Sequence, residues 1–315
     1  MSELAITTDA LTKTYGETRA VDGVSLNVRR GAIYGFLGRN GAGKTTTIRM
    51  LLGLAKPTAG SARVLGFNAG WGSGSDQIAI LERTAFVSQK KTLYASWTPA
   101  DLVRYTRGYY RSWSDSAVEK YANALEIPMK KRFGKLSQGN QTKVCLLLAL
   151  AQGADLLVLD EPTVGLDPVV IDQVLRILVE DIAAEGRTIF FSSHQLSEVE
   201  QISDWVGVID NGRLLLESRL EDIKSEYRLI TAAGNALPRG RSPEVLSLVA
   251  EGNFCKYVVT KNAEAFAREL SRNGATVTGV SPLSLREIFL ELVRKEQPCT
   301  SGNAGATTVS VSSSF

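Results

Sequence analysis

Three glycines, a lysine and a threonine lie close together in the run Gly38-Arg39-Asn40-Gly41-Ala42-Gly43-Lys44-Thr45. The run follows an apolar stretch and precedes a helical pattern that starts at Thr46. Glycines allow backbone N–H groups to turn inward, and the start of a helix adds partial positive charge. In this pattern the lysine reaches the β- and γ-phosphates of a nucleotide, and the threonine hydroxyl binds Mg²⁺. The run therefore predicts a nucleotide-phosphate site.

Two adjacent carboxylates end an apolar run in the middle of the chain, where Asp160 and Glu161 follow Leu156–Leu159. Like charges side by side in a partly dry site repel each other, so a nearby cation would relieve them. Asp160 is placed to hold Mg²⁺ through its water shell, which leaves Glu161 to polarise an attacking water. A solvated acidic turn is the alternative, and the glycine-rich run favours the catalytic interpretation.

Strands and helices must position these groups, and residues 1 to about 220 alternate short apolar runs with helical patterns, which indicates α/β layering. Four continuous apolar runs predict buried strands of a parallel sheet. They are Ala32–Leu37, Thr84–Ser88, Leu156–Asp160 and Thr188–Ser192. Because ligands bind at the carboxyl ends of such strands, Gly38, Asp160 and His194 are expected at one edge of the sheet.

Local signals add a hairpin and two helices to this sheet. Asn211-Gly212 tolerates positive φ and predicts a tight turn between strands at Val206–Asp210 and Arg213–Leu216. Thr98-Pro99 is expected to open a helix that runs to about Tyr110. A second helix should start after Ser114 and stop at about Glu126, before Pro128.

Composition divides the chain into three zones. Residues 1–222 hold the motifs above, with a helical subdomain at about 90–150, and residues 223–297 have the pattern of a small α/β subdomain. Its expected elements are strands at Arg228–Ala232, Tyr257–Thr260 and Ala275–Gly279 and helices at Ala263–Arg272 and Leu283–Arg294. Residues 298–315 carry no charge and are rich in Ser, Thr, Gly and Ala, so we expect a disordered tail.

Composition also excludes several classes of protein. The 315 residues include one histidine and three cysteines, too few for multi-histidine metal centres, zinc clusters or a disulfide framework, and this favours a reducing cytoplasm. A net charge of +3 is too small to argue for nucleic acid. The N-terminus has no signal-peptide pattern and no apolar run reaches about 18 residues, so no membrane span is expected.

Together with Leu136-Ser137-Gln138-Gly139-Asn140, these motifs resemble the nucleotide-binding subunit of ATP-binding cassette (ABC) transporters over residues 3 to about 220. The resemblance implies a P-loop NTPase fold of the ABC type, with a mixed sheet core and a helical subdomain. It also implies ATP and Mg²⁺ as cofactors. The nucleotide-binding residues would then be Gly38, Asn40, Gly41, Ala42, Gly43, Lys44, Thr45 and Thr46.

The resemblance assigns further roles. Tyr15 matches the aromatic residue that stacks on adenine, Gln89 matches the glutamine that senses Mg²⁺ and the attacking water, and His194 matches the γ-phosphate contact. Glu161, His194 and Gln89 would be the catalytic residues. Asp167, in Gly165-Leu166-Asp167, resembles the loop that crosses the dimer interface. The implied metal site consists of Thr45, Gln89 and Asp160.

The signature run departs from the family pattern Leu-Ser-Gly-Gly-Gln at Gln138 and Asn140, while Ser137 and Gly139 remain to contact the nucleotide of an opposite subunit. Similar changes occur in a branch of small exporter ATPases with a C-terminal extension. The closing Leu283–Arg294 pattern also resembles that branch, but core packing is favoured for it over a regulatory role.

The resemblance implies two subunits arranged head to tail around two ATP molecules. They would drive a separately encoded permease that rests near Gln89, at the cytoplasmic face of the membrane, without nucleic acid as a partner. Export is the expected direction. The aromatic helical insert is a candidate docking face, in particular Trp97.

A non-transport ABC-type ATPase switch, as in translation or DNA-associated regulation, is the alternative. The single cassette and the absence of heptad arms argue against it. A small GTPase would need an Asn-Lys-x-Asp run, and the sequence has none. A degenerate ATP-sensing scaffold is disfavoured because Lys44, Asp160, Glu161 and His194 are all present.

Overall fold

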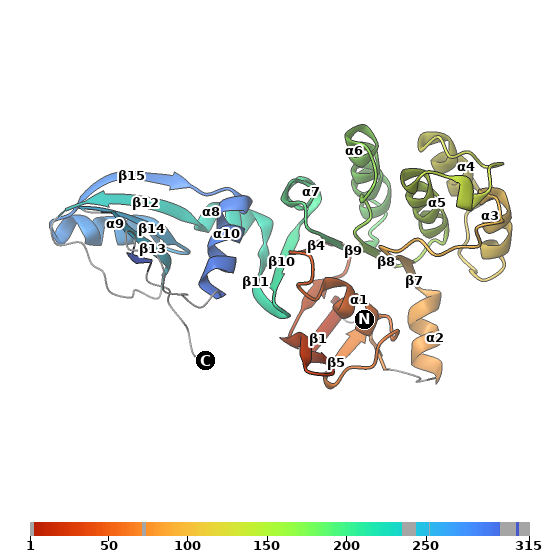
Figure 1. Ribbon diagram of the computed structural model, residues 1–315, viewed down its shortest axis with the longest axis horizontal. Helices are drawn as coiled ribbons and strands as arrows, with labels where there is room; N and C mark the ends of the chain where they lie inside the picture. The colour runs from red at the N-terminus through yellow and green to blue at the C-terminus, as the bar shows by residue number, and fades with distance from the viewer. Residues whose placement is uncertain (1–2, 71–73, 235–243, 252, 297–306, 309–315) are drawn as a thin grey trace. The chain divides into compact units, whose positions relative to one another are not determined.

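The computed structural model describes residues 3–70, 74–234, 244–251, 253–296 and 307–308 (Figure 1). The chain divides into two compact units between Glu217 and Ser218. The boundary expected from the sequence, between residues 222 and 223, falls within helix α8 (Leu220–Glu226).

A six-stranded sheet forms the centre of the first unit, in the order β11-β10-β4-β9-β8-β7. Its strands from β10 to β7 pair in parallel. The bounds are Ile33–Gly38 (β4), Thr84–Val87 (β7), Leu156–Asp160 (β8), Thr188–Ser193 (β9), Trp205–Asp210 (β10) and Arg213–Arg219 (β11). All residues of β4, β8 and β9 are buried, which explains why their sequences are continuous apolar runs. The four predicted central strands are therefore confirmed.

The predicted hairpin is also present, since β10 and β11 are neighbours in the sheet. Asn211 and Gly212 join them with φ values of 46° and 78°. Positive φ at both turn positions matches the right-handed twist of the strands, and this dipeptide adopts it at little cost.

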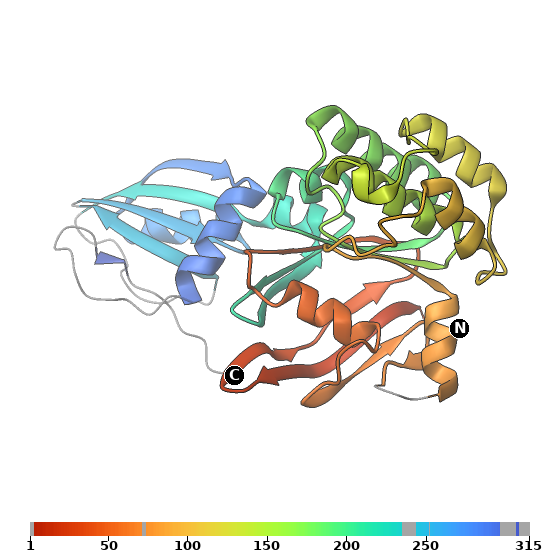
Figure 2. The ribbon, with the colours of Figure 1, turned by 45° about the vertical axis from the view of Figure 1, so that its right-hand side comes forward.

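A second, antiparallel sheet lies on one side of the central strands (Figures 1 and 2). Its strands are Leu4–Tyr15 (β1), Thr18–Val24 (β2), Asn27–Arg29 (β3), Ala59–Val64 (β5) and Phe67–Asn68 (β6). Helix α1 (Lys44–Leu51) touches strands of both sheets. A shared core, which includes Leu26, Phe36, Met50 and Val158, joins the two layers. Helix α2 (Gly74–Glu82) packs beside β6 and β7.

Helices cover the opposite face of the central sheet (Figure 1). They are α5 (Gln138–Ala151), α6 (Pro168–Arg176) with its π-helical continuation Ile177–Ala183, and α7 (Leu196–Ile202). Contacts of α7 with β4 and β9, and of α5 with β7, fix this layer to the strands. The central sheet therefore lies between a helical layer on one face and the antiparallel sheet with α1 on the other.

The helical insert contains the two predicted helices, α3 (Pro99–Arg107) and α4 (Asp115–Ala124), and a short 3₁₀ turn at Phe133–Lys135. A capping box between Thr98 and Asp101 starts α3, and the Ser114 hydroxyl accepts the Ala117 N–H at the start of α4. Both helices end earlier than predicted. Gly108 follows α3, and Glu126 adopts a left-handed conformation with φ 52° after α4.

The second unit has its own sheet, in the order β15-β12-β14-β13-β16, and three helices among its described residues. The strands are Arg228–Ala233 (β12), Val245–Glu251 (β13), Phe254–Val259 (β14), Thr276–Pro282 (β15) and Thr307–Thr308 (β16). Helix α9 (Ala263–Arg272) has the predicted bounds. Helix α10 (Leu285–Glu296) starts later than predicted because Ser284 caps it through Glu287.

The predicted disordered segment, 298–315, lies outside the described residues except for Thr307–Thr308. These two residues pair with Ala250 and Val249 of β13, contrary to the prediction for them. Within the described part of the chain, no helix is both long and apolar enough to cross a membrane.

Candidate active site

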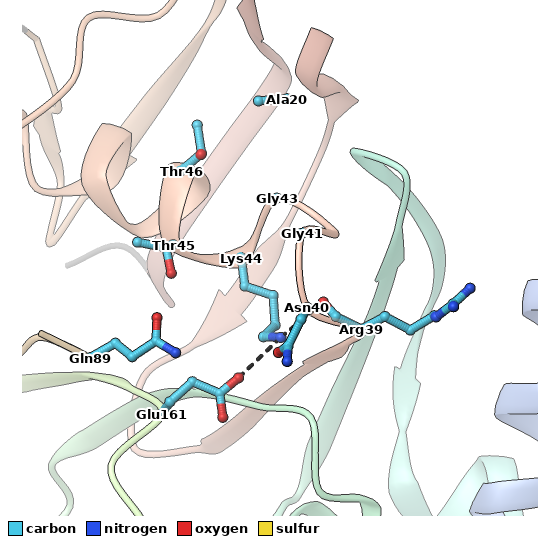
Figure 3. Close-up of a pocket in the computed structure, with 10 residues that line it drawn as sticks. All are labelled: Ala20, Arg39, Asn40, Gly41, Gly43, Lys44, Thr45, Thr46, Gln89 and Glu161. Carbon is cyan, nitrogen blue, oxygen red and sulfur yellow. Dashed lines mark hydrogen bonds and ion pairs between the residues drawn. The ribbon is translucent and has the colours of Figure 1, made fainter. Parts of the chain in front are cut away.

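A cavity of about 210 Å³ lies at the carboxyl edge of the parallel strands, next to the start of α1 (Figure 3). Segments far apart in the sequence meet there: the loop before α1, the second residue after β7 and the residue directly after β8. The lining residues are Ala20, Arg39, Asn40, Gly41, Gly43, Lys44, Thr45, Thr46, Gln89 and Glu161. Most of the nucleotide-binding residues predicted from the glycine-rich run therefore surround one cavity.

The loop before α1 has a backbone that only glycine accommodates. Gly41 and Gly43 adopt φ values of 82° and 107°, and a Cβ atom on Gly43 would lie 2.5 Å from the Ala20 carbonyl oxygen. Gly43 is the N-cap of α1, and no side chain among the described residues caps this helix. The first N–H groups of α1 therefore remain available to an anion, which fits the triphosphate of a nucleotide.

Lys44 and Glu161 face each other in the cavity (Figure 3), with Nζ 3.1 Å from Oε1. Their side chains are 6% and 3% exposed. Lys44 Nζ also donates to the carbonyl oxygens of Gly38 at 2.7 Å and Arg39 at 3.2 Å. The ammonium group is thus held at the floor of the loop, where a phosphate can replace these partners.

Asp160 is fixed from both sides. Thr45 Oγ1 donates to its Oδ2 at 2.8 Å, and Ser192 Oγ donates to its Oδ1 at 2.7 Å. Ser192 Oγ also accepts the Glu161 N–H at 3.1 Å. The Thr45 hydroxyl and the Asp160 carboxylate are in contact, and Gln89 lines the same cavity as Thr45. These three oxygen donors are of the kind that Mg²⁺ prefers. The sequence did not reveal the role of Ser192, because a serine in a buried strand gives no signal of its partner.

His194 directly follows β9 and contacts Glu161, with Nδ1 2.7 Å from Oε2. A carboxylate only accepts hydrogen bonds, so Nδ1 donates. Glu161 adopts φ 51°, a left-handed conformation that residues other than glycine rarely adopt. Strain of this kind clusters at functional sites. It turns the carboxylate toward Lys44 and His194, which are both potential cations.

The loop after β7 carries a half-buried cation close to Gln89. Lys91 Nζ donates to the Ser88 carbonyl oxygen at 2.6 Å, and burial lowers the pKa of Lys91. Cys145 of α5 lies near it, and burial raises the pKa of this thiol to about 11. The Lys91 bond ties the loop that bears Gln89 back to the end of its strand.

Eight predicted residues are not part of the cavity lining. Gly38, Ala42, Asp160 and His194 adjoin or contact lining residues, whereas the other four lie apart from them. Tyr15 ends β1 and is 49% exposed, with Lys13 Nζ 4.9 Å from its ring centroid. Ser137 caps α5 by accepting the Asn140 N–H, and Asp167 caps α6 by accepting the Val170 N–H. Gly139 packs against the loop after Glu161, since a Cβ atom there would lie 2.8 Å from the Gly165 carbonyl oxygen. The structure thus joins the signature run to the Asp167 loop, apart from the phosphate cavity.

Comparisons with known proteins agree with this site. A family model described as ABC transporter matches residues 21–164, and an AAA-domain model matches residues 131–200. The bacitracin transport ATP-binding protein BcrA of Bacillus licheniformis is 42% identical over 72% of this chain and 74% of that protein. The Nod factor export ATP-binding protein I of Neorhizobium galegae is 31% identical over 93% of this chain and 86% of that protein.

A solved structure of an ATP-binding subunit of an ABC transporter superposes with a TM-score of 0.63 and 26% identity, over 70% of this chain and 92% of that one. The fold and the site define an ATP-binding cassette ATPase, and the chain belongs to the family of ABC transporter ATP-binding proteins. It is the subunit that hydrolyses ATP to drive transport.

Proposed function

We propose that this subunit powers an exporter, as one of two ATP-binding subunits attached to a separate permease at the cytoplasmic face of the membrane. The observation that carries the catalytic part is Glu161, held between Lys44 and His194 in the cavity that the phosphate loop lines. The Nod factor protein, which is similar along almost the whole chain, supports export.

In the proposed reaction, Lys44 binds the β- and γ-phosphates, and Glu161 orients the attacking water and accepts its proton. His194 holds Glu161 from the other side and contacts the γ-phosphate. Thr45, Asp160 and Gln89 would hold Mg²⁺, which neutralises phosphate charge when it is bound. The contact between Thr45 and Asp160 supports this assignment.

The signature run would act on the nucleotide of the second subunit. Ser137, Gly139 and Asp167 are outside the cavity that holds Lys44, so a head-to-tail dimer is the arrangement that gives them a nucleotide to contact. Ser137 is exposed at the start of α5, so its hydroxyl and the helix N-terminus would be open to a γ-phosphate. Tyr15, exposed at the end of β1, would stack on adenine.

Glu161→Gln tests the catalytic assignment. The amide keeps the size of the side chain but cannot accept the proton, so we expect kcat for ATP hydrolysis to fall by at least about 100-fold. Binding of a fluorescent ATP analogue should persist, and ATP with Mg²⁺ should trap a dimer in gel filtration. Glu185→Gln, an exposed glutamate paired with Arg187, is the matched control and should hydrolyse ATP normally. Retained hydrolysis in Glu161→Gln would remove Glu161 from this role.

An aromatic patch on the helical insert is the proposed permease contact. It consists of Tyr94, Trp97, Tyr105 and Tyr109, whose neighbouring ring centroids lie 4.5 to 6.3 Å apart. Three of these rings are largely exposed, at 57% for Tyr94, 45% for Tyr105 and 64% for Tyr109. A contiguous exposed aromatic surface is typical of protein interfaces. The patch begins in the loop that carries Gln89, so a partner bound to the patch could move with Gln89 and thereby with the nucleotide cavity.

Trp97→Ala and Tyr94→Ser test the patch by co-purification with the permease and by permease-stimulated hydrolysis. We expect both signals to weaken while hydrolysis by the isolated chain remains. Phe254→Ser, which removes an aromatic side chain of the second unit that is 57% exposed, is the control. Normal assembly and stimulation in both patch variants would refute the proposed contact.

A further inference from the structure

A buried carboxylate with no assigned role lies behind the catalytic pair. Glu198 of α7 is 3% exposed, and its Oε2 accepts a hydrogen bond from Ser193 Oγ at 2.7 Å. Burial raises the pKa of Glu198, and the hydroxyls of Thr163 and Ser193 oppose this effect. Among the described residues, neither Glu198 Oε1 nor Thr163 Oγ1 forms a hydrogen bond of good geometry. A buried acid with incomplete hydrogen bonding destabilises a fold, so stability alone does not account for it.

The hydrogen bonds of Ser193, one of them to Glu198, bracket His194. Ser193, the residue before His194, donates its hydroxyl to Glu198. The same Ser193 oxygen accepts the N–H of Gln195, the residue after His194, at 2.9 Å. The Glu198 carboxylate thus anchors the Ser193 hydroxyl, which holds the backbone across His194, while the His194 imidazole contacts Glu161.

Glu198 also lies close to the loop that bears Glu161. Thr163 follows Glu161 and Pro162, and its buried hydroxyl acts on the Glu198 carboxyl. The charges of Glu161 and His194 both affect the pKa of Glu198, in opposite directions. Because α7 packs on β4 and β9, Glu198 is anchored to the sheet rather than to either loop.

We propose that Glu198 is a positioning residue for ATP hydrolysis: through Ser193 it holds the His194 loop so that the imidazole donates from Nδ1 to Glu161. The proposal rests on the roles given above to Glu161 and His194. The alternative is that Glu198, near the start of α7, only stabilises this helix, as an acid in a first turn does. The two hypotheses differ in what they predict for the tautomer of the His194 imidazole when Glu198 is replaced.

His194 is the only histidine in the sequence, so the NMR signals of a histidine label come from this residue alone. The full chain, labelled with ¹⁵N-histidine and prepared without a histidine tag, gives one pair of ring nitrogen signals. In the wild-type protein we expect the Nδ1–H tautomer, because Glu161 accepts from Nδ1. In Ser193→Ala and Glu198→Ala the loop loses its anchor, so the signals should shift toward a mixture of tautomers.

Kinetics supply the second readout. We expect kcat to fall by about 10- to 100-fold in Ser193→Ala and Glu198→Ala, with KM for ATP within about twofold, because a displaced side chain affects the reacting geometry more than binding. Glu198→Gln keeps an oxygen that accepts from Ser193, so it should restore the wild-type signals and most of kcat. Glu200→Gln on the same helix is the control and should change neither.

Both readouts must change together. Unaltered His194 signals in Ser193→Ala and Glu198→Ala would overturn the proposal, and so would altered signals with normal kcat or equal changes in kcat and KM. If Glu198→Ala does not fold, Ser193→Ala tests the same hydrogen bond, because it removes the donor and leaves the buried carboxylate in place. The signals do not depend on hydrolysis, so a failure of the role of Glu161 would be seen separately, in Glu161→Gln.

Discussion

Removing either charge of the Lys44–Glu161 ion pair should lower the stability of the nucleotide-free protein, but by different amounts. In Lys44→Met, Glu161 is left 3% exposed with only His194 as a side-chain partner described for its carboxylate. In Glu161→Gln, Lys44 keeps the Gly38 and Arg39 carbonyl oxygens. The lysine variant should therefore be the less stable of the two.

The expected magnitude lies between two limits. Exposed ion pairs contribute about 0–1 kcal/mol, and removing one partner of a fully buried pair costs about 3–5 kcal/mol. Lys44 and Glu161 are buried but line a cavity that solvent enters, so we expect Lys44→Met to lose about 2 kcal/mol. For a unit of this size that lowers Tm by about 4–8 °C. Glu161→Gln should lose less than about 1 kcal/mol.

The assay is thermal unfolding of the full chain without nucleotide or Mg²⁺, followed by circular dichroism. The double variant Lys44→Met/Glu161→Gln should be more stable than Lys44→Met, because the unpaired carboxylate is gone. Lys120→Met, which breaks an exposed pair with Asp181, is the control and should shift Tm by less than about 2 °C. The reasoning is refuted if Lys44→Met melts like the wild-type protein, or if Glu161→Gln does not restore stability to it.

Further measurements test other parts of the structure. Gly139→Ala places a methyl group 2.8 Å from the Gly165 carbonyl oxygen, so it should cost about 1–3 kcal/mol in a melt and slow hydrolysis. Because the pKa of Cys145 is about 11 instead of 9.0, its thiolate is about 100-fold scarcer near pH 8; mass spectrometry should find slow alkylation that accelerates up to about pH 11. Hydrogen bonds from Thr98 lower the pKa of Asp101, which stabilises the fold above pH 3.8 and is lost as pH falls through the lowered value. In Thr98→Ala a ¹³C-carboxyl titration should show a higher pKa for Asp101, and an unchanged value would contradict the capping box.

The central sheet was predictable because its strands are buried on both faces. Leu156–Asp160 has five buried residues in sequence, and a short apolar run bounded by polar residues is typical of a central parallel strand. The N-terminal sheet was not predicted. Strand β1 contains a left-handed residue, Ala10, and register shifts between Leu11 and Thr14, so its alternation of buried and exposed residues is interrupted. A bulged strand loses the twofold period by which a sequence reveals it.

The same distinction applies to the site. The phosphate loop and the Asp160-Glu161 pair are contiguous motifs that each follow a predicted strand, so the sequence alone predicted that they lie at one edge of the sheet. Ser192 and Glu198 contribute through tertiary geometry: Asp160 contacts Ser192 because β8 and β9 align in that register, and Glu198 reaches Ser193 because α7 folds back beside β9. Hydrogen bonds that depend on strand register or on the orientation of a helix cannot be derived from spacing in one segment.

Strand β9 has a consequence for protein engineering. Three successive side chains at its end serve three partners: Ser192 binds Asp160, Ser193 binds Glu198, and His194 binds Glu161. Adding or deleting one residue in this strand would turn every later side chain to the opposite face and break all three connections at once. The segment from Thr188 to Glu198 therefore has a fixed length. A peptide tag or a fluorescent reporter should be inserted outside this segment.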